Sequence, residues 1–219
     1  GSEMCIRDRD QDSHDEESHS VHEIDEHVWT SPVNAEKIVE VLADQLKELD
    51  QKNAAVYKEN AAEYEEKLQE LDGQFREVVE NADSRLLIFG DRFPFRYLAE
   101  DYGLTYYAAF PGCSAETEAS FETIVFLSEK VESLHLPCVL VTEGSNSSLA
   151  KTILENAGSD GKILTLQSLQ AVSQKEIDTG VTYLSKMQEN YDVLKQALNS
   201  RGGVKIYGTT HWKRCHIGL

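Results

Sequence analysis

A short apolar run, Arg85-Leu86-Leu87-Ile88-Phe89-Gly90, has the length and composition of a buried β-strand. A helical pattern over residues 94–102 follows and stops at Gly103, and a second apolar run extends from Leu104 to Phe110. The same alternation continues along the chain, with strands predicted at 138–142 and 162–166 and helices at about 116–133, 147–157 and 176–198. Strands alternating with helices of this length are typical of a parallel α/β domain. We therefore expect a four-stranded parallel sheet with flanking helices.

Two further helices are predicted before this domain. Residues 34–89 contain no proline and a single glycine, Gly73. Apolar residues recur there at helical spacing, which predicts one helix at about 34–49 and a longer one at about 53–81. Near the other end of the chain, Ser173 and Glu176 have the spacing of a capping box before the final helix.

Composition excludes several classes of function. The 219 residues include 21 Lys and Arg against 39 Asp and Glu, a formal charge of −18, whereas binding nucleic acid requires clustered basic residues. Apolar residues make up 40% of the chain, enough for a folded core, but no apolar run reaches the length of a membrane-spanning helix. The four cysteines are far apart and form no CxxC pair, which excludes a zinc ribbon and a disulfide scaffold.

The two ends of the chain differ from its middle. Residues 1–26 contain ten acidic residues, two arginines and three histidines, a composition that predicts disorder. The histidines of this segment, His14, His19 and His22, form a candidate metal-collecting tract. Residues 200–219 contain no acidic residue and several glycines, and we expect them to be disordered as well.

The most informative segment is Asp25-Glu26-His27-Val28-Trp29-Thr30-Ser31-Pro32-Val33-Asn34-Ala35. Neutral imidazole is a common metal ligand, and a neighbouring carboxylate can hold its second nitrogen. His27, which lies between acidic residues and an aromatic residue, is therefore a candidate ligand. The ends of the predicted strands offer the remaining candidates, since ligands of parallel α/β domains gather beyond the carboxyl ends of the strands.

This segment resembles the "hHVWlsPxNA" signature of the zinc- and manganese-binding solute receptors of bacterial ABC importers. Three other segments resemble the same family in the same order. Residues 89–104 resemble its "Hdaf.YfardYGL" segment, residues 110–120 the loop and helix start that follow, and residues 180–198 its closing "G.tYl.lM..N...Lk.aL" helix. The resemblance covers about residues 14–199.

The resemblance implies two α/β lobes joined by one long helix, with the metal between them. It implies a remnant of the first lobe at 27–52, the connecting helix at 53–82 and a second α/β lobe at 83–199. The acidic segment 1–26 and a tail at 200–219 complete this organisation. The first lobe is incomplete, because its opening half has no counterpart before His27. We therefore expect a chain truncated at its N-terminus.

The family's metal ligands transfer only in part. The first, a histidine, matches His27, but the second histidine slot holds Arg92, which cannot bind a metal. Asp91, one residue earlier, is the candidate substitute, and Cys113 is a candidate thiolate in the loop that carries the third ligand. The fourth slot, usually aspartate, aligns with Gln167. Candidates for supporting these ligands are Glu143, Glu116 and Arg92.

The function implied is capture of a divalent transition metal and its delivery to a membrane ABC permease. A periplasmic or membrane-anchored extracellular location, a monomer and no nucleic-acid partner are expected. Zn²⁺ is favoured by the histidine tract and Cys113, whereas Asp91 and Gln167 favour Mn²⁺ as the alternative. A metal-independent surface adhesin is a second alternative. An enzyme is not expected, since the chain contains no GxSxG, GxxxxGK[ST] or GxGxxG motif.

Overall fold

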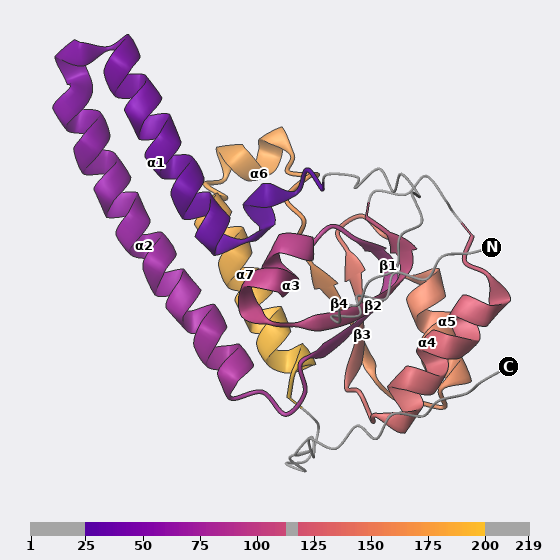
Figure 1. The fold of residues 1–219 in the computed structure, drawn as a ribbon. Coiled ribbons are helices and arrows are strands. Elements are labelled where there is room, and N and C mark those ends of the chain that lie inside the picture. The colour runs from indigo at the N-terminus through magenta and orange to yellow at the C-terminus, as the bar shows by residue number, and fades with distance from the viewer. Residues whose placement is uncertain (1–24, 113–117, 200–219) are drawn as a thin grey trace, which may run out of the picture.

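The computed structural model describes residues 25–112 and 118–199, which form a helical hairpin and an α/β lobe (Figure 1). The hairpin segment contains η1 (Val28–Thr30), α1 (Pro32–Leu49), η2 (Gln51–Asn53) and α2 (Ala54–Glu80). The predictions for the acidic segment up to residue 24, for the tail at 200–219 and for Cys113 and Glu116 lie outside the described residues. So do the tract histidines His14, His19 and His22.

The lobe is built on a four-stranded sheet in the order β2-β1-β3-β4, and every neighbouring pair of strands is parallel. The strands are β1 (Leu86–Phe93), β2 (Thr105–Pro111), β3 (Cys138–Thr142) and β4 (Lys162–Leu166). The helices are α3 (Arg96–Tyr102), α4 (Phe121–Ser133), α5 (Ser148–Asn156), α6 (Gln174–Asp178) and α7 (Tyr183–Ala197). The predicted fold class, a parallel α/β lobe with a four-stranded sheet, is confirmed.

Each face of the sheet has its own hydrophobic core. One core joins the sheet to α2, α3 and α7 through residues such as Phe75, Phe89, Leu98 and Met187, all of them fully buried. The other lies under α4 and α5 and includes Ile88, Val139 and Ile153. Figure 1 shows these helices on opposite sides of the sheet. Alternate residues of β1 enter opposite cores, as the period of a strand requires.

The C-terminal half of α2 is anchored in the first of these cores. The Phe75 ring stacks on Tyr102 at a centroid distance of 5.3 Å and meets Tyr191 edge-on at 6.1 Å. The Tyr102 hydroxyl donates to Asp72 Oδ1 of α2 at 2.9 Å. These contacts fix the hairpin to the lobe. The role of α2 as a connection between two lobes stays a prediction.

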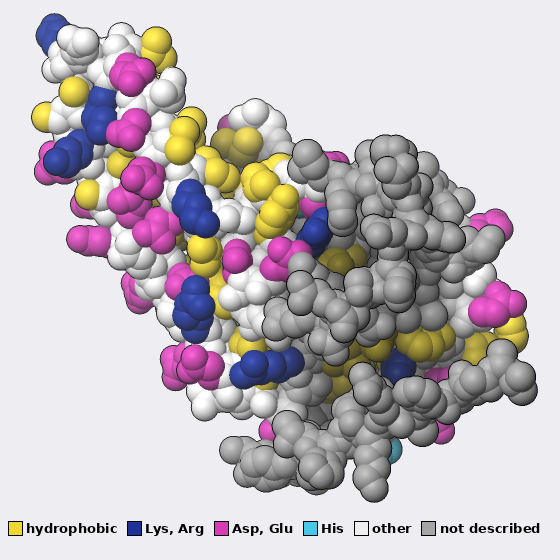
Figure 2. All heavy atoms as spheres, viewed as in Figure 1, with side chains coloured by type: hydrophobic (Ala, Val, Ile, Leu, Met, Phe, Trp, Pro, Cys, Tyr) yellow, Lys and Arg dark blue, Asp and Glu magenta, His cyan; other side chains and the backbone are white. Residues whose placement is uncertain are grey.

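The far end of the hairpin contributes little to either core. Several of its large apolar side chains are exposed, and Leu49 is 83% exposed. Figure 2 shows hydrophobic side chains on this surface among acidic and basic groups. The exposed residues are Val41, Leu42, Leu46, Leu49 and Val56. Their helical spacing predicted the helices correctly, but in the described part of the chain these side chains remain exposed to solvent.

A β-bulge shapes the carboxyl end of β1. Phe89 pairs with Ala108 and Arg92 with Phe110, so β1 has one residue more than β2 in this interval. A bulge bends its strand and redirects side chains. Gly90 lies within the bulge, where a Cβ atom would come within 2.6 Å of the Ala150 Cα atom of α5. Glycine is therefore required for α5 to pack this closely on the sheet.

Two helix predictions need correction. The helix predicted from about residue 116 begins at Phe121, because the Ser120 side chain caps it by accepting from the Thr123 N–H. The single final helix predicted at 176–198 is two helices. The capping box of Ser173 and Glu176 is present but serves the short α6, which ends before Gly180 at φ +88°. A second capping box at Thr182 and Ser185 then starts α7.

No helix within the described residues has the length and apolar character needed to cross a membrane.

The close contact at Gly90 gives a stability prediction. Gly90→Ala forces a methyl group against the backbone of α5, and we expect it to lower the free energy of unfolding by about 1–3 kcal/mol. The matched control is Gly73→Ala, at an exposed position of α2 with no atom within 4 Å of a new Cβ. It should raise stability by about 0.5–1 kcal/mol, since glycine is a poor helix former. Urea unfolding measures both, and equal effects would contradict the close packing.

Candidate metal site

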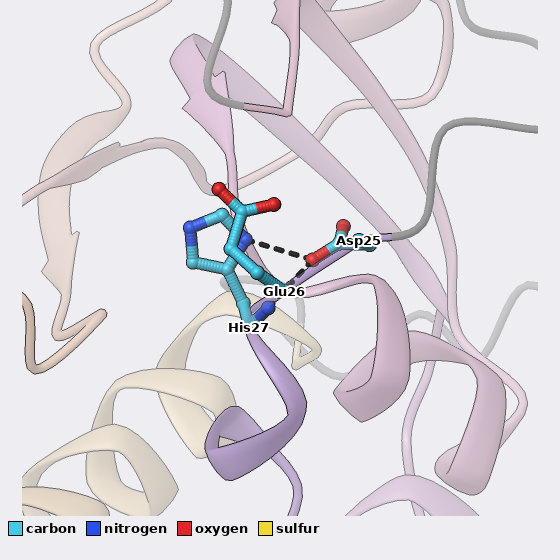
Figure 3. A group of neighbouring side chains, drawn as sticks. All are labelled: Asp25, Glu26 and His27. Atoms are coloured by element: carbon cyan, nitrogen blue, oxygen red, sulfur yellow. Dashed lines mark hydrogen bonds and ion pairs between the residues drawn. The ribbon is translucent and has the colours of Figure 1, made fainter.

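His27 is a buried histidine held by an aspartate of its own segment. The side chain is 1% exposed, and its Nδ1 atom lies 2.7 Å from Asp25 Oδ1. The same carboxylate oxygen accepts from the His27 backbone N–H at 2.9 Å. Figure 3 shows this pair, with the Glu26 carboxylate beside the imidazole ring. A carboxylate at Nδ1 favours the tautomer with hydrogen on that nitrogen and the lone pair on Nε2, the tautomer in which a histidine binds a metal through Nε2.

Long-range hydrogen bonds fix the segment around His27 to the lobe. Trp29 Nε1 donates to the Ser168 carbonyl oxygen at 2.9 Å, and the Tyr183 hydroxyl donates to the Trp29 carbonyl oxygen at 2.9 Å. Burial raises the pKa of Tyr183, so its hydroxyl stays protonated as a donor. Two more bonds of this kind are Tyr97 Oη to the Asp25 carbonyl oxygen and Ser31 Oγ to Asp101 Oδ2. The position of His27 is therefore set by the loop after β4, by α3 and by α7.

Asp91 lies at the end of the bulge in β1 and faces β3. Its side chain is almost buried, and its Oδ2 atom accepts from the Thr142 hydroxyl and from the Thr142 N–H. The other carboxylate oxygen lies 3.8 Å from Arg92 Nη1. The Arg92 guanidinium also lies over the Phe110 ring, 5.6 Å from its centroid. An acidic and a basic group thus lie side by side at the carboxyl end of β1, one of the two inner strands.

A cavity of about 400 Å³ opens at this end of the sheet. It lies between β1 and β3, where the strand order reverses, which is the usual place for a ligand in an open α/β sheet. Its lining residues come from the ends of these strands and of β2, from the loop after β3 and from the start of α5. Those with polar or charged side chains are Asp91, Arg92, Thr142, Glu143, Ser145, Asn146 and Ser148.

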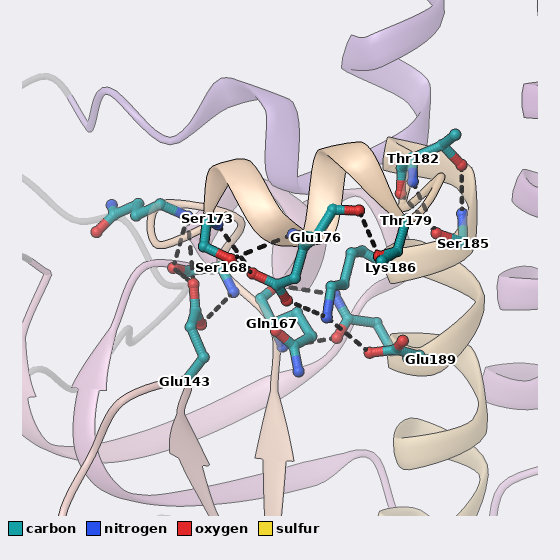
Figure 4. A network of polar contacts seen from close by, with 12 residues as sticks. Glu143, Gln167, Ser168, Ser173, Glu176, Thr179, Thr182, Ser185, Lys186 and Glu189 are labelled. Carbon is teal, nitrogen blue, oxygen red and sulfur yellow. Dashed lines mark hydrogen bonds and ion pairs between the residues drawn. The ribbon is translucent and has the colours of Figure 1, made fainter.

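Glu143 holds the loop that follows β4. Its carboxylate accepts from the Ser168 N–H and the Ser168 hydroxyl, both at 2.6 Å, and from the Gln170 N–H at 3.2 Å. Figure 4 shows this network across the ends of β3 and β4. Ser168 is also the residue whose carbonyl oxygen Trp29 binds. Glu143 therefore supports the segment of His27 indirectly, through this loop.

The backbone of Gln167 is clamped by Asn190 of α7. Asn190 Oδ1 accepts from the Gln167 N–H at 2.7 Å, and Asn190 Nδ2 donates to the Gln167 carbonyl oxygen at 2.9 Å. Asn190 is 1% exposed, so both bonds are shielded from water. This pair of bonds extends the hydrogen bonding of β4 by one residue and fixes where the Gln167 side chain begins.

The predicted site residues fall into separate groups. Asp91, Arg92 and Glu143 line one cavity, which His27 and Gln167 do not line. Within residues 25–112 and 118–199, Asp25, Glu26 and His27 form the one group of at least three potential ligands with their ligand atoms within 4.8 Å of one another. Cys113 and Glu116 lie outside the described residues. The approach of His27 to Asp91, Cys113 and Gln167 stays a prediction.

A sequence profile described as "Zinc-uptake complex component A periplasmic" matches residues 2–197, nearly the whole chain. The chain belongs to this family. A curated relative, the zinc-binding lipoprotein AdcA of Streptococcus pneumoniae, is 34% identical over 196 residues. The alignment covers 86% of this chain but 37% of the relative, so the chain spans much less than the full length of that protein.

Solved structures of the same family have the same fold. The Zn(II)-bound ZnuA-like domain of AdcA from Streptococcus pneumoniae matches with a TM-score of 0.66 and 32% identity, over 83% of this chain and 67% of that domain. A laminin-binding protein of Streptococcus agalactiae, described as bifunctional with adhesin and metal-transporting activity, matches with a TM-score of 0.69 and 25% identity. It covers 80% of this chain, and the chain covers 65% of it. These matches support the predicted two-lobe receptor class.

Several residues that hold the site were not predicted. Tyr97, Tyr183 and Asn190 contact segments between 23 and 154 residues away in sequence. No local pattern marks such partners. The sequence did indicate that an acidic neighbour could hold the second nitrogen of His27, and Asp25 does so.

The clamp on Gln167 gives a second prediction. Asn190→Ala leaves a backbone N–H and a carbonyl group at the end of β4 without their partners, and we expect a loss of about 1–3 kcal/mol in the free energy of unfolding. The control is Asn81→Ala at the exposed end of α2, which should change stability by no more than about 0.5 kcal/mol. Denaturant unfolding that gives equal values for the two variants would contradict the clamp.

A third prediction concerns how the stabilising effect of Glu176, in α6, depends on pH. Hydrogen bonds from Ser173 and contact with Lys186 lower the pKa of Glu176 from its ordinary 4.5 to about 2. The folded state thus favours the charged form of Glu176. The stabilisation that this carboxylate provides is complete above about pH 4.5 and is lost as the pH falls toward 2. Glu176→Gln should therefore lower the melting temperature at pH 7, by an amount that shrinks in this acidic range.

The control for this measurement is Glu129→Gln, an exposed glutamate of α4. A difference between Glu176→Gln and the unmodified chain that stays constant from pH 7 to pH 2.5 would contradict the assignment.

Proposed function

We propose that this chain is part of an extracytoplasmic receptor that captures Zn²⁺ and passes it to a membrane ABC permease. The observation that carries the proposal is His27, buried to 1% exposure with Nδ1 on the Asp25 carboxylate. A histidine oriented in this way has the arrangement found in protein zinc sites, where an outer carboxylate fixes the ring and makes it a better ligand. The zinc-uptake family and the Zn(II)-bound relative support the choice of metal.

His27 supplies one ligand of the proposed site, and zinc prefers about four nitrogen, sulfur or oxygen ligands. Asp91, Cys113 and Gln167 remain the proposed partners. Asp91 is supported by its place in the cavity at the carboxyl ends of the strands, and Gln167 by the clamp that fixes its backbone. Mn²⁺ is the alternative cargo, and competition between the two ions during loading distinguishes them.

Binding of this kind involves no chemical reaction. Affinity comes from deprotonated ligands that close around the ion, and release to the permease requires that they open again. A monomer suffices for this function. The lipoprotein and periplasmic descriptions of the family and of AdcA support a location outside the cytoplasm.

The experiment that tests the proposal is zinc titration of two histidine variants. His27→Ala removes the imidazole of the site, and we expect it to weaken Zn²⁺ binding by more than about 10-fold. The control is His135→Asn, at an exposed position with φ 49° between α4 and β3, because asparagine tolerates this backbone conformation. His135→Asn should bind like the unmodified chain in calorimetry or in competition with a chromophoric chelator.

Unchanged affinity in His27→Ala would contradict the proposed site. It would move zinc binding to His14, His19 and His22, whose combined replacement would then remove it.

A second candidate function is adhesion to a host protein. The similarity to a laminin-binding protein with both adhesin and metal-transporting activity favours it. Binding to immobilised laminin that persists after treatment with a metal chelator would establish adhesion as a separate, metal-independent activity.

A further inference from the structure

The cavity between β1 and β3 is larger than a metal ion requires. Its volume is about 400 Å³, whereas one water molecule takes up about 30 Å³ in the liquid. Cavities of about 300–1,000 Å³ are typical of small-molecule sites. Its place at the reversal of strand order is also that of a small-molecule site. The cavity therefore has room for a small organic molecule of up to about a dozen non-hydrogen atoms.

Three charged side chains line the cavity, and Glu143, the second acidic one, already accepts hydrogen bonds from Ser168 and Gln170. The remaining pair, Asp91 and Arg92, favours a ligand with both signs of charge. Asp91 is 8% exposed and supplies a carboxylate, and the neighbouring Arg92 side chain is 37% exposed and supplies a guanidinium. A guanidinium binds a carboxylate with two parallel hydrogen bonds. Beside a bare divalent cation, however, Arg92 would be repelled. A carboxylate placed between Arg92 and the cation removes that repulsion, since it attracts both.

Hydroxyl and amide groups surround this charged pair. Ser145 and Asn146 line the cavity from the loop before α5, Ser148 from the first residue of α5, and Thr142 from β3. Thr142 also donates to Asp91 through its hydroxyl and its backbone N–H, which fixes the orientation of the carboxylate. Groups of this type bind the amine and carboxylate of a small polar molecule better than an apolar ligand.

We propose that this cavity takes the metal as a complex with a small chelator of the amino-acid class. The carboxylate of the chelator binds Arg92, and the metal lies on the side of Asp91. This inference rests on the proposed function, because the metal in the complex is the cargo of the receptor. It adds the chemical form in which the cargo is captured.

The test is equilibrium dialysis of the full chain with isotopically labelled L-histidine, with and without Zn²⁺. Histamine is the matched probe, because it chelates zinc through the same imidazole and amine but has no carboxylate. We expect histidine to be retained with zinc in equal amounts, and histamine to be retained at least about 10-fold less strongly. This comparison uses the unmodified chain and does not depend on the folding of a variant.

The variants locate the carboxylate. Arg92→Gln should lose retention of the histidine complex by at least about 10-fold. Arg85→Gln, at an exposed position just before β1 and at the opposite end of that strand, should retain it like the unmodified chain.

Four results would overturn the inference. Three of them leave the proposed receptor function standing. They are zinc binding without retained histidine, equal retention of histidine and histamine, and retention by Arg92→Gln equal to that of the unmodified chain. Histidine retained equally without zinc would show an amino-acid site in place of a site for a metal complex. A chain that binds no zinc under any condition would instead refute the proposed function itself.

Discussion

The structure around His27 depends on the hydrogen bond from Trp29 to the Ser168 carbonyl oxygen. This bond joins residues 139 positions apart and ties the segment before α1 to the loop after β4. The loop is itself fixed, because the Glu143 carboxylate accepts from both polar hydrogens of Ser168. Tyr183 completes the attachment from α7. A buried imidazole is thus held at the carboxyl end of the sheet by parts of the chain that meet only in the folded lobe.

The shape of the sheet accounts for the polar cavity between the carboxyl ends of β1 and β3. The bulge in β1 and the close contact of Gly90 with α5 bring Asp91 against Thr142 of β3. The ends of the two strands then enclose a polar cavity that contains both an acidic and a basic group. The structure therefore presents two kinds of chemistry, an imidazole supported by an aspartate and a cavity lined by charged and hydroxyl groups.

The sequence predicted most of the fold because its signals are local. The strands at 138–142 and 162–166 have the bounds expected, since apolar runs between turn residues mark buried strands. The break between α6 and α7 was missed, because its cause is a second capping box and a left-handed glycine inside an otherwise helical pattern. Asp91 and Glu143 were expected at strand ends and do line a cavity there. Asn190 and Tyr183 were missed, because their partners are distant in sequence.

The central claim is that His27 provides the imidazole that binds zinc in this lobe. The most direct measurement is zinc K-edge X-ray absorption of the chain loaded with one equivalent of Zn²⁺ in a buffer free of amino acids. The account predicts one imidazole in the first shell, at about 2.0–2.1 Å, with the remaining ligands oxygen or a sulfur at about 2.3 Å. The one other histidine in the described residues, His135, lies between α4 and β3. A shell of two or more imidazoles would therefore contradict the account.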